Sequence, residues 1–131
     1  MKKLLGLSVL AVALVLVTMP LFAHHGGAVY DNKPIRLTGT VTKFAFVNPH
    51  ILMYIDVKGP NGEVQQWTIE HSPPSLSVHQ GWYRDMMKPG DQVEMDVRPA
   101  KNGSFVGSGG GNLLVNGKNP IRTANEASGA Y

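Results

Sequence analysis

The stretch ILMYIDVKGPNGEVQQWTIE, residues 51–70, decides the fold class because it contains two strand patterns and the turn between them. In its first half every second residue is aliphatic or methionine, which is the period of two expected of a half-buried strand. The Asn-Gly pair at 61–62 is a strong signal for a tight turn. Residues 64–70 form the returning strand, with Trp67 and Ile69 on one face. The stretch predicts a β-hairpin with one buried face.

Two further segments carry strand signals on either side of this hairpin. Residues 37–47 are rich in β-branched and aromatic residues, and Gly39 within them indicates a bulge or a bend. Asn48-Pro49 ends this strand, because proline donates no N–H and restricts the residue before it. Residues 92–98 alternate valine or methionine with polar residues and form the clearest half-buried strand of the chain.

The segment that follows the hairpin changes character and predicts a short helix. Residues 72–75, Ser-Pro-Pro-Ser, are expected to start it, since serine caps free N–H groups and proline suits the first turn. Residues 76–80 then make one or two turns, which Gly81 ends. Trp82 is expected to plug the end of a barrel.

The order of these elements indicates the architecture. The glycine-rich residues 103–111 are expected to form a flexible loop, and residues 113–115 and 121–122 a last short hairpin or strand. Three strands, a short helix and two or more strands follow the order of an OB-like barrel. We expect a mostly β protein, a small OB-like barrel of five to six strands, closed or partly open, with one short helix between strands 3 and 4. A small β-sandwich is the alternative, but closure removes exposed edges.

The start of the chain has the pattern of a secretory signal. Met1-Lys2-Lys3 precedes an apolar run over residues 4–17, and the small Ala23 follows. A membrane anchor is the alternative, but the run is shorter than the roughly 20 residues needed to span a bilayer. We expect cleavage near Ala23 and no membrane attachment afterwards. The expected segments are a signal peptide (1–23), a His-containing arm (24–36), the OB-like barrel (37–122) and a frayed tail (123–131).

Charge and cysteine content exclude several classes of function. The chain has 12 Lys and Arg against 9 Asp and Glu, and removal of residues 1–23 takes away two lysines. The remaining cations are scattered singly, whereas nucleic-acid binding needs them clustered on one face, so we expect no nucleic-acid partner. The chain contains no cysteine, which excludes disulfides, thiolate metal sites and a cysteine nucleophile. Export without cysteine fits a bacterial periplasm.

The pair His24-His25 is the first candidate metal site. Cleavage after Ala23 would place His24 at the new N-terminus, where its α-amine and its ring nitrogen can chelate one metal ion. Cleavage one residue earlier would make His25 the third residue, which is another known Cu(II) chelate. All-nitrogen sites of this kind favour Cu(II). The alternative interpretation is a polar, unordered leader.

Four other residues, outside this pair, complete the candidate sites. His50 follows Asn48-Pro49 on the face opposite Ile51, where it could be a further metal ligand or a turn residue bound to a backbone carbonyl. His71 is expected to be a partly buried histidine at the barrel rim or part of a binding surface. That candidate surface for a ligand or partner comprises His71, Trp82 and Tyr83. We expect His79 to face solvent.

Motifs of catalysis are absent from the sequence. Neither a Gly-x-Ser-x-Gly elbow nor a phosphate-binding Gly-x-x-x-x-Gly-Lys-Ser/Thr loop occurs, so we lean against an enzyme. The leading hypothesis is an exported binding protein that holds Cu(II) through His24, His25 and His50. The alternatives are a metal-independent interaction module for an unidentified envelope protein or small ligand, and a copper-dependent oxidative enzyme.

Five short motifs complete the sequence analysis: Ala23-His24-His25-Gly26, Leu37-Thr38-Gly39-Thr40-Val41, Asn48-Pro49-His50, Gly81-Trp82 and Met87-Lys88-Pro89-Gly90-Asp91. With these motifs the chain resembles a family of small exported bacterial proteins catalogued as a domain of unknown function. The resemblance covers about residues 22 to 100 and implies a periplasmic, OB-like barrel with no activity to transfer. The tail from Lys101 onward and Gly27 depart from the pattern.

Overall fold

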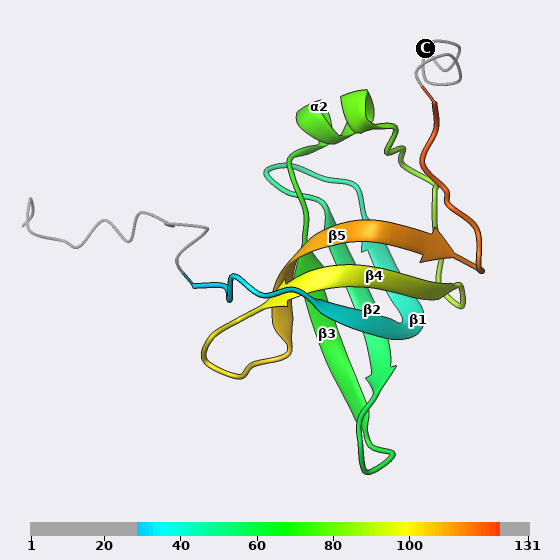
Figure 1. Cartoon of the computed structure of the whole chain (residues 1–131). Helices are drawn as coiled ribbons and strands as arrows, with labels where there is room; N and C mark the ends of the chain where they lie inside the picture. Colours follow the sequence, from blue (N-terminus) through cyan, green and yellow to red (C-terminus); the bar gives the residue numbers. More distant parts are fainter. Residues whose placement is uncertain (1–28, 124–131) are drawn as a thin grey trace, which may run out of the picture.

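Five strands form one closed barrel in the part of the chain that the structure describes, residues 29–123 (Figure 1). The strands of this computed structural model are β1 (Ile35–Ala45), β2 (Leu52–Lys58), β3 (Val64–Glu70), β4 (Gln92–Pro99) and β5 (Val106–Val115). Their order around the barrel is β1-β2-β3-β5-β4, and β4 pairs back onto β1. Neighbouring strands are antiparallel except β3 and β5. The prediction of a mostly β, OB-like barrel is confirmed, with five strands and closure.

The core fills the inside of this barrel because alternate side chains of each strand point inward. The β2–β3 register pairs Met53 with Ile69 and Ile55 with Trp67, so the apolar faces expected of the two strands lie on the same, buried side. Burying an aliphatic side chain of this size contributes about 1.5–3 kcal/mol to folding. The apolar residues with at most 1% of their surface exposed are Val41, Ile51, Met53, Ile55, Ile69, Val93, Met95 and Val97.

A short helix covers one end of the barrel between β3 and β4, as predicted. Figure 1 shows α2 (Pro74–Ser77) above that end, followed by the 3₁₀ turn η1 (Val78–Gln80). Gly81 ends the turn with a positive φ of 85°, a conformation that glycine adopts without strain. Trp82 is buried, with 5% exposed, which fits its expected role as a plug. Among residues 29–123, no helix is long and apolar enough to cross a membrane.

The start of this helix differs from the prediction. The N-cap residue is Pro73 and no side chain caps the helix, so Ser72 does not have the expected role. The hydroxyl of Ser77 donates instead to the carbonyl oxygens of Ser72 and Pro73, at 3.2 and 3.0 Å. Proline at the first position needs no partner for an N–H, which reduces the need for a capping side chain.

Residues 106–111 of the glycine-rich segment are in a strand, which corrects the prediction of a flexible loop over residues 103–111. Residues 106–111 form the first half of β5 and pair with β4 and, in part, with β3. A Cβ at Gly107 would lie 2.2 Å from the Cγ1 atom of Val97, so the close approach of β4 and β5 requires glycine there. Irregular register along β5 accompanies positive φ angles at Gly109 and Gly110. Residues 121–122, expected in a last strand, are not in one.

Candidate functional site

His50 lies at a corner of the barrel, in the connection between β1 and β2. The next residue, Ile51, is fully buried, so His50 faces outward, and 42% of its side chain is exposed. Glu70, the last residue of β3, also faces outward because Ile69 before it is buried. The register pairs Leu52 with Glu70, which brings the carboxylate beside the start of β2. Strand register therefore places Glu70 within reach of His50.

The carboxylate of Glu70 accepts hydrogen bonds from two side chains. Its Oε1 atom contacts the Nδ1 atom of His50, and its Oε2 atom accepts a 3.2 Å hydrogen bond from the Tyr30 hydroxyl. Because a carboxylate accepts, the contact with His50 places a hydrogen on Nδ1. In the neutral ring the lone pair is then on Nε2, where an exposed imidazole can bind a metal.

Tyr30 attaches the segment before β1 to the barrel next to this site. Its side chain is 7% exposed, and its backbone pairs with Ala100. The backbone N–H of Asp31 donates to the carbonyl of Pro99 at 2.8 Å. Burial and the neighbouring Glu70 carboxylate raise the pKa of Tyr30, so its hydroxyl stays protonated as the donor. Tyr30 therefore attaches the segment expected as the N-terminal arm to the barrel beside Glu70, the residue that also contacts His50.

The predicted metal ligands divide between two parts of the chain. His24 and His25, like the expected signal peptide (1–23) and the end of the expected tail, lie outside the described residues. Within residues 29–123, no three histidine, aspartate or glutamate side chains form a group that could hold a metal ion. The described part of the candidate centre is therefore His50 together with Glu70 and Tyr30.

His71 lies inside the rim of the barrel and is part of a different environment. Its ring stacks on the indole of Trp82 with centroids 3.9 Å apart, and Nδ1 lies 2.6 Å from the carbonyl oxygen of Gly109. This is the partly buried rim histidine, one of the two interpretations of the sequence. Burial lowers the pKa of His71, so the ring is neutral at neutral pH. The buried Nε2 atom has no hydrogen-bond partner among the described residues.

A pocket of about 550 Å³ adjoins His71 and Trp82, between β5 and the segment after it. The polar side chains of Arg36 and Asn112 and the apolar side chain of Ile121 contribute to its lining. The third residue of the candidate surface, Tyr83, lies outside this pocket and beneath the guanidinium of Arg122, which is 3.6 Å from the ring centroid. His79 is exposed on η1, as expected.

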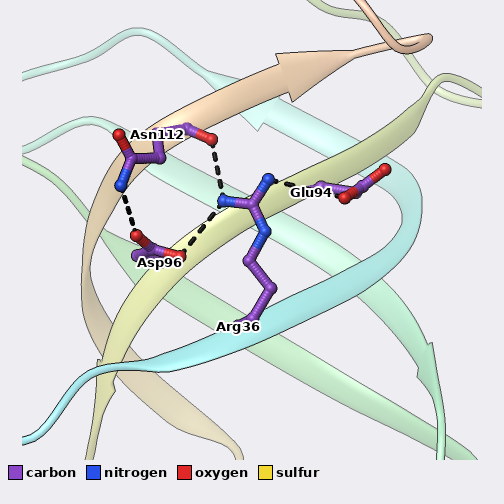
Figure 2. Close-up of polar contacts among 4 residues, drawn as sticks. All are labelled: Arg36, Glu94, Asp96 and Asn112. Atoms are coloured by element: carbon purple, nitrogen blue, oxygen red, sulfur yellow. Dashed lines mark hydrogen bonds and ion pairs between the residues drawn. The ribbon is translucent and has the colours of Figure 1, made fainter.

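Arg36 belongs to a polar network that joins β1, β4 and β5 (Figure 2). Its guanidinium donates to Asp96 at 3.1 Å, to the carbonyl oxygen of Asn112 at 2.8 Å and to Glu94 at 3.4 Å. The amide of Asn112 donates to Asp96 at 2.6 Å. The network holds Arg36 at the edge of the pocket. Arg36 lies on β1, and Glu94 and Asp96 lie on the neighbouring strand β4. The sequence alone does not bring these charges together, because it does not give the register between β1 and β4.

The sequence did not single out Tyr30, and it did not place Glu70 beside His50. The bond between them joins residues 40 positions apart. No local pattern predicts such a contact, because it depends on where the segment before β1 crosses the barrel.

Comparison with known proteins gives one family. A model described as a family of unknown function, DUF6152, matches residues 11–109. No curated protein matches the chain.

Proposed function

The chain belongs to the family of unknown function DUF6152, and we propose that it is a small exported protein that binds Cu(II) through His24, His25 and His50. The observation that carries the proposal is the contact between His50 and Glu70. Metal-binding histidines usually donate their second ring N–H to a carboxylate, which fixes the ring and raises its basicity as a ligand. His50 has that arrangement, with Nε2 left for a metal ion.

The N-terminal histidines supply the remaining donors after removal of the signal peptide. With His24 at the N-terminus, its amine and ring nitrogen form a chelate that a single histidine elsewhere cannot form. Tyr30 lies six positions after His24 in the chain. An extended chain spans at most about 20 Å over that length. Because Tyr30 is bonded to the partner of His50, this reach supports a shared metal ion.

The kinds of donor atom at this site determine which metal we propose. Amine and imidazole nitrogens are its donors, and thiolates are excluded because the chain contains no cysteine. Such nitrogen sites favour Cu(II), which also leads the affinity order of the divalent first-row metals. The place in the fold agrees with binding, since the β1–β2 connection of OB-like barrels commonly contacts ligands.

The test is a Cu(II) titration of the natively processed protein, after N-terminal sequencing has located its first residue. We expect one tight site in the wild type, with markedly weaker binding in a His24→Ala/His25→Ala variant and in His50→Ala. His79→Ala is the matched control, since His79 is exposed on η1 and distant in sequence from the site. Equal affinity in wild type and His50→Ala would exclude the shared site, and an N-terminus far from residue 24 would exclude the chelate.

A second candidate function is binding of a small ligand beside His71 and Trp82. Its supporting observation is the buried Nε2 atom of His71, which has no hydrogen-bond partner within residues 29–123 and lies next to a pocket of about 550 Å³. With only 5% of Trp82 exposed, the pocket favours a small molecule over a protein partner for these residues. Titration with amino acids and monosaccharides, followed by Trp82 fluorescence in a Trp67→Phe variant, tests this candidate. A fluorescence change that persists in His71→Phe would count against it.

A further inference from the structure

A second pocket, of about 460 Å³, lies beside the segment after β5 and has no part in the proposed function. Its lining includes Tyr83, Met86, Val115, Lys118 and Arg122. We propose that this pocket binds a small organic carboxylate. Lys118 and Arg122 contact the carboxylate group, and the apolar side chains contact the hydrocarbon body. This inference goes beyond the copper site and does not depend on it.

The charges in the lining favour an anion. Lys118 and Arg122 are its only charged residues, and neither forms an ion pair with another residue in the range 29–123. By contrast, Arg36 at the pocket of about 550 Å³ is paired with Glu94 and Asp96. Two unpaired positive charges attract an anionic ligand. The second pocket, and not the larger one, is therefore suited to a carboxylate.

The ring of Tyr83 orients the guanidinium of Arg122. The Cζ atom lies 3.6 Å from the ring centroid, so the flat group lies against the face of the ring. The N–H bonds of a guanidinium lie in its own plane and stay free to donate when its face is covered. Within residues 29–123 this side chain donates to no acceptor. It can therefore form the paired hydrogen bonds that a carboxylate accepts from arginine.

Backbone hydrogen bonds hold both cations at the pocket. The segment after β5 runs along the connection between η1 and β4 (Figure 1), where the N–H of Arg122 donates to the carbonyl of Gly81 at 3.1 Å. The N–H of Lys118 donates to the carbonyl of Val115 at 3.1 Å, and its carbonyl accepts from the N–H of Val115 at 2.8 Å. Because these bonds fix the backbone beneath each cation, less conformational freedom is lost when a ligand binds.

The apolar residues of the lining favour an organic anion over an inorganic one. Met86 and Val115 are core residues with 5% and 9% of their surface exposed, and Ile121 packs against the same core. Hydrocarbon removed from water beside such residues favours binding, whereas phosphate and sulfate have no apolar surface to bury. The volume of about 460 Å³ is within the range of small-molecule sites. These properties indicate a carboxylate with a short aliphatic or aromatic body.

The probes are benzoate and hexanoate, each titrated into the ¹⁵N-labelled full processed chain and followed by two-dimensional NMR. We expect saturable shifts of the backbone amide signals of Tyr83, Lys118 and Arg122. Benzamide has the shape of benzoate without its charge, and acetate has the charge without the ring. Each lacks one of the two recognised groups, so each should bind at least about tenfold more weakly than benzoate.

Substitution of each cation tests its contact with the carboxylate. Arg122→Gln should weaken benzoate binding about tenfold or more, since hydrogen bonds between charged groups are the strong ones. Arg122→Lys keeps the charge without the planar fork and should give an intermediate affinity. Lys118→Gln removes an exposed cation, which should cost about two- to fivefold and leaves the packing of the fold intact. Circular dichroism confirms that each variant is folded.

The matched control is Lys58→Gln, which removes the same charge from the chain. Lys58 pairs with Val64 at the end of the β2–β3 hairpin and does not line the pocket. We expect benzoate to bind this variant as it binds the wild type. An equal loss in Lys58→Gln and Lys118→Gln would assign the binding to net charge and overturn the site.

Three further results would overturn the inference. One is the absence of saturable binding by both benzoate and hexanoate. Another is benzamide binding as tight as that of benzoate, which would leave an apolar pocket without recognition of an anion. The third is an unchanged affinity in both Arg122→Gln and Lys118→Gln. None of these results affects the Cu(II) titration, so failure of this inference and failure of the proposed function are distinguishable.

Discussion

Replacement of Glu70 by glutamine is the most informative single substitution at the candidate metal centre. The carboxylate accepts from the Nδ1 atom of His50 with one oxygen and from the Tyr30 hydroxyl with the other. Glutamine has one acceptor oxygen, so it satisfies only one of these donors and turns its NH₂ group toward the other. If the oxygen stays with Tyr30, the ring of His50 loses the bond that leaves Nε2 available to a metal.

We expect Glu70→Gln to weaken Cu(II) binding about 10-fold or more, which is the usual effect of losing a carboxylate behind a histidine ligand. A tenfold change corresponds to about 1.4 kcal/mol of binding free energy. The assay is chelator competition on the processed protein, and Glu63→Gln is the control, because Glu63 precedes the opposite end of β3. An affinity within twofold of the wild type would refute the role of Glu70, provided that His50→Ala still weakens binding.

Three further predictions concern the fold. Gly107→Ala should lower the free energy of unfolding by about 1–3 kcal/mol in urea titration, since its Cβ would lie 2.2 Å from the buried Val97, whereas Gly111→Ala should change little. Ile69→Ala should cost about 2–5 kcal/mol, measured in the same way, because Ile69 is fully buried. The pKa of Asp91 is lowered from its ordinary value of 3.8 to about 2, and the largest cause is the hydrogen bond from Asn116. Its stabilising effect is thus present above pH 4 and is lost as pH falls toward 2, so the wild type should lose more stability over this range than Asp91→Asn.

The barrel follows from the sequence because its core strands are read from alternation alone. Val93, Met95 and Val97 alternate with polar residues, and all three are buried in β4. β2 and β3 form the hairpin that this alternation predicts, with the Asn-Gly pair in the turn between them. The alternation identifies these strands and their buried faces because each strand has one face in the apolar core and the other in water.

β5 could not be predicted in the same way, because glycine has two opposite meanings. A run of glycines usually indicates a loop, but in β5 it permits strands to approach where a Cβ would collide with Val97. The distinction depends on the neighbour across the sheet, and the sequence does not identify that neighbour.

The candidate site could also be predicted only in part from the sequence. The outward orientation of His50 followed from its parity with the buried Ile51. The hydrogen bond of Tyr30 with Glu70 did not follow, because the two residues are 40 positions apart in the chain. Local patterns predict which face a side chain occupies, and only the closed barrel determines which distant side chain it meets.

Electron paramagnetic resonance of the processed protein with one equivalent of Cu(II) tests the central claim most directly. If His50 shares a copper ion with the N-terminal histidines, nitrogen hyperfine structure should be present and the spectrum should change in His50→Ala. His79→Ala should leave the spectrum unaltered. Identical spectra for the wild type and His50→Ala would contradict the shared site.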